Sequence, residues 1–181
     1  MRFLFTASML FVLAACETTS SRPYKASTEN ILAIQQAMHS SSSKVQIGNF
    51  TAADGVNVEP TCRAMGALEV APGQSPVTYI KDAFQEELFN AGVYDITSGM
   101  QINAQITELK FNSFGTGSWT VAMKVSSDSL PEGYTTHVEY SFKTSFSAIS
   151  ACQNVIDAFQ PTVSELLNRV VRDPNFVRLA S

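Results

Sequence analysis

The sequence has 181 residues, of which 45% are hydrophobic and 15% charged, and its 12 basic and 16 acidic side chains give a formal net charge of −4. This length is typical of one domain of ordinary size. A mildly acidic chain without clusters of lysine and arginine argues against nucleic acid as a partner, because phosphate neutralisation requires a basic patch.

The first fifteen residues have the pattern of a secretory signal peptide. A single cation, Arg2, precedes an apolar run of about ten residues that ends at Leu13. The run is too short for a membrane-spanning helix, which needs roughly 20 apolar residues. We therefore predict that residues 1–15 are a signal peptide that the working protein has lost.

The end of this segment resembles the lipobox of bacterial lipoproteins. Leu13, Ala14, Ala15 and Cys16 supply the apolar residue, the two small residues and the cysteine of that motif. The resemblance implies that the Cys16 thiol carries a diacylglycerol, that cleavage occurs just before it, and that the new amino group is acylated. The alternative is an ordinary cleavable signal peptide that happens to be followed by a cysteine.

The lipid has consequences for location and cofactors. Two or more acyl chains anchor a protein stably, whereas one holds it only marginally. The residue after the cysteine is Glu17, and in enteric lipoproteins an aspartate at this place favours the inner membrane. We therefore expect the periplasmic face of the outer membrane, with the lipid on Cys16 as the only attached group and no other cofactor.

Residues 16–43 are predicted to be the lipid anchor and a polar tether. Its stretch from Glu17 to Thr28 is rich in serine and threonine. Apolar residues at near-helical spacing in Asn30 to His39, with Thr28 as a plausible N-cap, indicate a possible short helix. The globular domain is then expected to be residues 44–181.

Cysteine pairing is simple once Cys16 is assigned to lipid. Cys62 and Cys152 are the two thiols that remain, in an oxidising compartment, so one disulfide is possible. It would close a loop of roughly 90 residues, which the chain-entropy model values at about 4 to 5 kcal/mol. The alternative is two buried thiols that never meet. A redox or nucleophilic role lacks both a C-x-x-C motif and a nearby histidine.

The first half of the domain contains one strand and one helix. Residues 44–51 alternate apolar and polar side chains up to a phase change near Gly48 and Asn49 that predicts a bulge. Residues 52–74 are expected to be mostly loop. Residues 75–91 predict a helix, with Ser75 as the N-cap, Pro76 in the first turn and Gly92 as the stop.

Three strands and a long helical segment follow. Alternation predicts a hairpin with its turn at Phe114 to Ser118, then a second turn over 126–133 and a strand over 135–146 with one polar face. In the last segment Pro161 is expected to kink or restart the helix, and Asp173 before Pro174 to end it. The order β-α-β-β-β-α predicts an α+β fold, a mixed, mainly antiparallel four-stranded sheet with two helices on one face.

This order of elements, together with the lipobox, resembles the small α/β lipoproteins of Gram-negative envelopes. Their members include the lipopolysaccharide-assembly lipoprotein, YajG-type lipoproteins and the auxiliary lipoproteins of ABC-type transporters. The resemblance implies an adaptor or assembly role with an envelope protein as partner.

The residues that could carry chemistry are few. The two histidines, His39 and His137, are far apart in the sequence and no metal-binding or nucleophile motif is present, so we expect a protein that is not an enzyme. Phe111, Phe114 and Trp119 surround the first hairpin turn, and aromatic residues at a loop tip are typical of interface hot spots. The alternative for these three is packing on each other or on the core. The alternative function is binding of a small amphiphile, such as a lipid, between the helices and the sheet.

Overall fold

The computed structural model describes residues 23–180. The predicted signal peptide, Cys16 and the beginning of the predicted tether lie outside these residues. None of the helices within 23–180 combines the length and apolar character that a membrane crossing requires. The elements, in chain order, are α1 (Thr28–Met38), β1 (Gln46–Ala52), α2 (Pro76–Asn90), β2 (Gln101–Asn112), β3 (Thr116–Ser127), β4 (Leu130–Lys143), α3 (Ala148–Arg172) and the short 3-10 helix η1 (Phe176–Ala180).

The four strands form one sheet in the order β1-β2-β3-β4. β1 pairs with β2 in parallel, and the other two pairs are antiparallel. The bulge predicted near Gly48 is present, because the register of β1 against β2 shifts between Ile47 and Phe50. The predicted α+β fold with a mixed, mainly antiparallel sheet is therefore confirmed.

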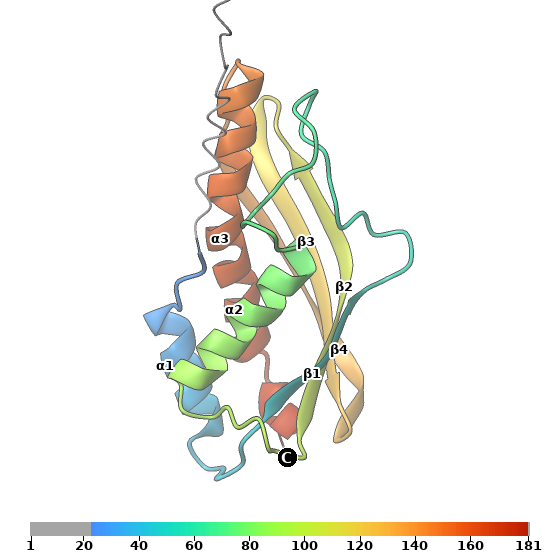
Figure 1. Ribbon diagram of the computed structural model, residues 1–181. Coiled ribbons are helices and arrows are strands. Elements are labelled where there is room, and N and C mark those ends of the chain that lie inside the picture. Colours follow the sequence, from blue (N-terminus) through green and yellow to red (C-terminus); the bar gives the residue numbers. More distant parts are fainter. Residues whose placement is uncertain (1–22, 181) are drawn as a thin grey trace, which may run out of the picture.

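The helices lie on one face of this sheet (Figure 1). α3 packs on β3 and β4, and α2 packs on β1. α1 contacts α2 and α3, so it forms a further layer over the two helices that the sequence predicted. The opposite face of the sheet carries the polar residues of the alternating pattern, among them the exposed side chains of Gln105, Lys110, His137 and Glu139.

Helix α2 forms where its local signals placed it. The Ser75 side chain accepts a hydrogen bond from the Thr78 main-chain N–H at 3.1 Å, and Pro76 occupies the first turn, where its missing N–H costs nothing. Gly92 has a φ of +77°, the left-handed conformation that ends many helices.

Helix α3 is a single helix of 25 residues that continues through Pro161. The expected restart at this proline is therefore not observed. Its apolar stripe supplies the buried side chains that cover the sheet, and the helix ends at Asp173, whose extended backbone before Pro174 takes it out of the helical region.

The globular unit begins earlier than residue 44. Tyr24 packs against the core, and α1 buries Ile34 and Met38 at 0% and 4% exposure. The N-cap of α1 is Ser27 instead of Thr28. The segment from Tyr24 onward is therefore part of the domain, and the tether predicted over 16–43 is correspondingly shorter.

Strand β4 also begins earlier than predicted. Ser127 pairs with Leu130, so the turn is tight and includes Asp128 and Ser129 instead of residues 126–133. Gly133, which the sequence placed in the turn, lies within the strand with a φ of +61°. A Cβ there would come within 2.1 Å of the Val125 carbonyl oxygen, so only glycine fits this close approach.

Candidate functional site: the hairpin tip and the groove beside β2

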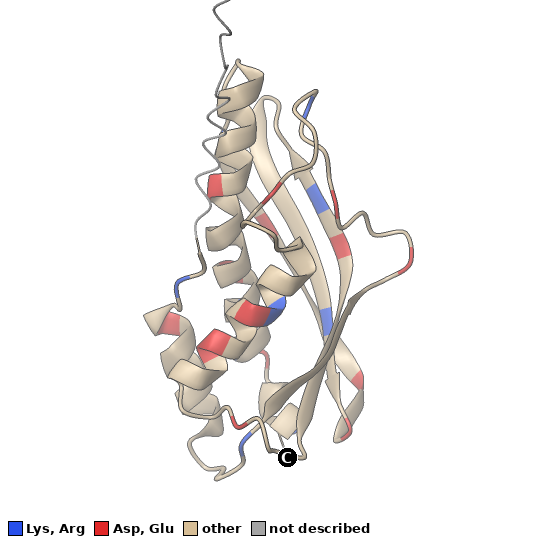
Figure 2. Cartoon of the chain, viewed as in Figure 1, with Lys and Arg blue, Asp and Glu red and all other residues tan. Residues whose placement is uncertain are grey.

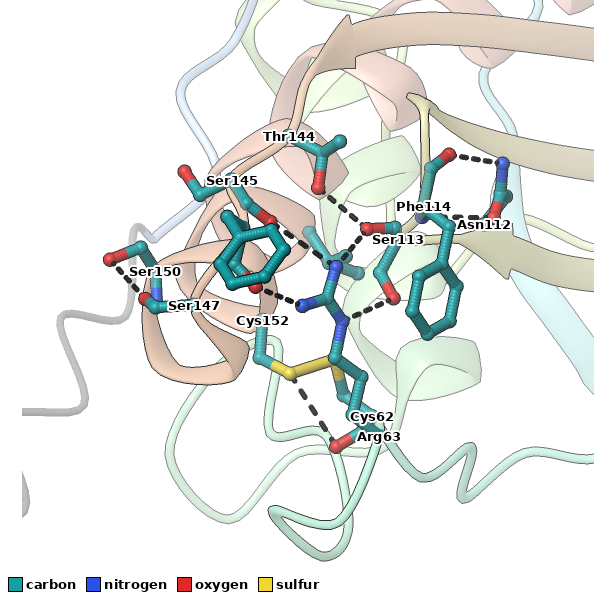
Figure 3. The surroundings of a disulfide bond; sticks show 12 residues. Cys62, Arg63, Asn112, Ser113, Phe114, Thr144, Ser145, Ser147, Ser150 and Cys152 are labelled. Atoms are coloured by element: carbon teal, nitrogen blue, oxygen red, sulfur yellow. Dashed lines mark hydrogen bonds between the residues drawn. A yellow bond between two sulfur atoms is a disulfide. The ribbon is translucent and has the colours of Figure 1, made fainter.

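The predicted disulfide between Cys62 and Cys152 is present, with a Cα–Cα distance of 5.8 Å. It joins the long loop after β1 to the first turns of α3, two segments 90 positions apart (Figure 3). Both cysteines are buried. The disulfide therefore holds this long loop against the domain.

Arg63, next in the chain, ties three segments together (Figure 3). Its guanidinium donates to the Oγ of Ser113 at 3.2 Å and to the Ser113 carbonyl at 2.5 Å. It also donates to the carbonyls of Phe146 at 3.0 Å and Ser145 at 3.3 Å. Arg63 has a φ of +50°, the one non-glycine positive value within 23–180. The long loop, the β2–β3 turn and the β4–α3 junction are thus fixed to one another.

Four exposed apolar side chains lie in, or directly beside, the three segments that Arg63 joins. Met65, Phe114, Phe146 and Ile149 are 52%, 65%, 105% and 70% exposed. The Phe114 ring lies against the Arg63 guanidinium, 4.4 Å from its carbon to the ring centre, a cation–π contact. We call these four residues the tip patch. Exposed apolar side chains gathered on a rigid support are typical of interaction surfaces.

The three aromatic residues predicted to bind a partner differ in their exposure. Phe114 is exposed in the tip patch, and Phe111 is half-buried with its ring 5.2 Å from that of Trp119. Trp119 is 0% exposed, so the prediction that it contacts a partner is wrong. Its position on the inward face of β3, opposite Tyr140 on β4, places it in the core instead.

A groove of about 380 Å³ lies beside the second half of β2. We call it the β2 groove. Loop residues Asn57, Thr61 and Arg63 lie along one side, and the run from Leu109 to Phe114 lies along the other. The pairing of β1 with β2 ends at Ile106. Among residues 23–180, no strand pairs with Glu108–Asn112 on the side opposite β3, so the groove follows an open edge of the sheet.

The space between the helices and the sheet is filled by side chains. A row of aromatic rings crosses it, with centre-to-centre distances of 4.8 Å from Trp119 to Phe159, 5.3 Å from Phe159 to Tyr79 and 6.2 Å from Tyr79 to Tyr24. Close packing of this kind is typical of a protein core.

The beginning of the described chain is held by a buried carboxylate. Oε1 of Glu87, a residue of α2 with 0% exposure, accepts hydrogen bonds from the Tyr24 hydroxyl at 2.5 Å, the Ser27 N–H at 2.9 Å and the Asn30 side-chain amide at 3.0 Å. Burial and the bond to Glu87 raise the pKa of the Tyr24 phenol well above its ordinary range. Asn30 also donates to the Ser164 carbonyl, which links the same cluster to α3.

The part of the chain from Pro23 to Ala180 contains no group of three or more histidine, cysteine, aspartate or glutamate side chains arranged to hold a metal ion. His137 lies on the polar face of the sheet, 4.0 Å from the Glu108 carboxylate, and both are exposed or half-exposed. The exposed His39 follows α1.

Sequence reasoning missed Arg63, Phe146 and Glu87. Nothing in the sequence signals that an arginine reaches two other loops. For Glu87 a signal was present, because it lies seven positions after Ile80 and three after Phe84, on the apolar side of the helix. For Phe146 the sequence did contain a signal that it lies at the end of its strand, because it ends an alternating run just before a serine-rich segment.

No family model matches this sequence, and no curated protein is significantly similar to it. Among solved structures, the chain is similar to the crystal structure of protein XCC0632 from Xanthomonas campestris, of the family DUF330. The two share 12% sequence identity, with 71% of this chain and 84% of that chain covered and a TM-score of 0.46. A similarity of this degree establishes neither a shared family nor a shared function.

Proposed function

We propose that this chain is a membrane-anchored periplasmic lipoprotein that acts as a non-catalytic adaptor or stabilising subunit of an envelope protein complex. The lipid on Cys16 holds it at the periplasmic face of the outer membrane. The observation that carries the adaptor role is the β2 groove, an open sheet edge beside a loop that the disulfide and Arg63 immobilise.

The groove suits an extended segment of a protein partner. Beyond Ile106, β1 no longer pairs with β2, so alternate main-chain N–H and C=O groups of Glu108–Asn112 face outward on that side of the strand. A strand added there can form hydrogen bonds with these groups. Native proteins usually cover the open edges of their sheets or prevent them from pairing with another strand. Here the edge is lined by Phe111 and Thr61, which supply side-chain contacts next to the main-chain ones.

The alternative role, a carrier of a small amphiphile between the helices and the sheet, is disfavoured by the packing of that space. Trp119 and Phe159 lie 4.8 Å apart there, and each is at most 1% exposed. A ligand in this position would have to displace core rings.

Site-specific photocrosslinking in cells tests the adaptor role. A benzophenone side chain at Thr61, which is exposed in the groove, should crosslink to one defined envelope protein. The matched control is the same side chain at Thr135, which is exposed on the polar face of the sheet. The substitution Thr61→Trp, which fills the groove, should weaken co-purification of that protein, and Thr135→Trp should not. Equal crosslinking from both positions would contradict the proposal.

A separate experiment tests the anchor. The variant Cys16→Ala should lose lipid modification and should no longer sediment with outer membranes. If it is still cleaved and still sediments with them, lipid is not what holds the protein there.

A further inference from the structure

We propose that the tip patch rests in the interfacial region of the same membrane that holds Cys16, so that the domain stands with its hairpin tip against the lipid. This inference rests on the proposed lipidation of Cys16 and adds a second, non-covalent contact to it. Three observations carry it: the exposure of the patch, its charge and the length of chain before Tyr24.

The patch is exposed and held in one arrangement. Phe146 is fully exposed, and Ile149 in the first turn of α3 is 70% exposed. The main chain of Phe146 accepts a hydrogen bond from Arg63, whose guanidinium also lies against Phe114. A membrane interface favours aromatic and aliphatic side chains presented in this way.

The charge around the patch suits anionic lipid. The three segments that form this end of the molecule, 60–67, 112–117 and 143–152, contain the cations Arg63 and Lys143 and no acidic residue. All 16 acidic residues of the chain lie elsewhere. Figure 2 shows the contrast, with the hairpin tip and the start of α3 mostly tan and most of the red ribbon segments further down. Cations near an anionic bilayer surface strengthen binding.

Among residues 23–180, three of the other four large exposed apolar side chains have a different setting, and the fourth, Val177, is only 38% exposed. Leu32, Phe89 and Ile96 are 53%, 68% and 73% exposed. An acidic residue lies within three positions of each of them, at Glu29, Glu86 and Asp95 respectively. An anionic membrane surface repels those carboxylates, so exposure alone does not distinguish the two ends of the molecule, whereas charge does.

The chain before Tyr24 is long enough for both contacts. Tyr24 lies eight positions after Cys16, so the two Cα atoms are at most about 28 Å apart. Tyr24 contacts Tyr79, which packs on Phe159 of α3. From Phe159 to the start of α3 at Ala148 the helix rises about 16 Å. The lipid on Cys16 and the tip patch can therefore reach one bilayer together.

Tryptophan fluorescence provides a direct test on the full lipidated protein. The chain has a single tryptophan, Trp119, which is fully buried, so its emission is a constant background. The variant Phe146→Trp adds a reporter in the patch, and the matched variant Phe89→Trp adds one at another exposed phenylalanine, near acidic residues. Each protein is reconstituted in vesicles of phosphatidylethanolamine and phosphatidylglycerol, with and without bromine on the acyl chains.

We expect brominated lipid to quench the added emission of Phe146→Trp and to leave that of Phe89→Trp and of the parent protein unchanged. The quenching should weaken when phosphatidylcholine replaces phosphatidylglycerol. Absence of quenching at position 146 in protein that the vesicles retain overturns the inference but leaves the anchor intact, and a protein partner is then the occupant of the patch. Equal quenching at both positions also overturns it, since the domain then has no preferred orientation. Protein that the vesicles do not retain overturns the anchor and this inference together.

Discussion

The indole N–H of Trp119 donates a hydrogen bond to the main-chain carbonyl of Val155, 2.8 Å away. The bond joins the middle of β3 to the first half of α3, and both residues are fully buried. A buried tryptophan usually finds a partner for its N–H, because leaving the group unpaired is costly. Trp119 therefore fixes the long helix to the sheet.

The first prediction separates this core role from the exposed tip. Trp119→Ala should lower the free energy of unfolding by about 3 to 5 kcal/mol, because it leaves a large cavity. Phe114→Ala should change it by less than about 1 kcal/mol, because its ring is 65% exposed. Urea denaturation of both variants measures the difference. Similar losses in the two would contradict the assignment of Trp119 to the core and Phe114 to the surface.

A second prediction concerns the buried carboxylate of α2. Glu87→Gln should destabilise the domain by about 1.5 to 3 kcal/mol, because the charged acceptor of the Tyr24, Ser27 and Asn30 donors is replaced by a neutral one. The control is Glu86→Gln on the same helix, whose carboxylate accepts the long 3.3 Å bond from Ala26. Hydrogen exchange should locate the loss in α1. If hydrogen exchange instead becomes faster uniformly over the whole domain, Glu87 does not stabilise the protein through α1.

The disulfide gives a third prediction. Replacing both Cys62 and Cys152 by serine should cost about 2 to 5 kcal/mol, because the bond closes a long loop. The loop around Arg63 should become susceptible to proteolysis, whereas the β3–β4 hairpin should stay resistant. Reduction of the disulfide in the parent protein is the matched control for the double serine variant. An unchanged midpoint in urea after reduction would mean that Arg63 and packing suffice to hold the loop.

A fourth prediction follows from the buried phenols. Burial, with a smaller contribution from Glu86, raises the pKa of Tyr79 to about 12 from its ordinary value of 10.0. The folded state therefore keeps a proton that the unfolded chain releases near pH 10, so stability is full below pH 10 and falls as the pH rises toward 12. Unfolding free energies on both sides of pH 10 measure the slope, and Tyr79→Phe should reduce it, while Tyr24 and Tyr134, whose pKa values burial also raises, supply the rest. An unchanged slope in that variant would exclude Tyr79 as its source.

The parts of the fold that were predictable from the sequence depend on local signals. Ser75, Pro76 and Gly92 act within a few positions of α2, and strict alternation identified β2 and β3. Strand β4 was predicted to begin too late because Gly133 is usually a turn residue. In the structure it meets the Val125 carbonyl across the sheet, a contact that no local pattern reveals.

The candidate site was less predictable because its contacts are distant in sequence. Alternation already put Trp119 on the inward face with Val121, while aromatic clustering near a turn raised a partner-binding role beside the alternative of core packing. Phe146 and Met65 come from segments 81 positions apart, and only Arg63 and the disulfide bring their surroundings together. Cysteine counting predicted the disulfide but gave no indication of the arginine beside it.

If Cys16 carries the proposed lipid, the early start of the domain at Tyr24 has a consequence for a partner of the protein. With folding from residue 44 onward, the chain after Cys16 would allow a height above the membrane of up to about 98 Å, whereas eight positions allow about 28 Å. The typical reach of a flexible chain grows only with the square root of its length, so it falls about twofold, from about 30 Å to about 16 Å. A partner close to the membrane then meets the domain at a correspondingly higher local concentration.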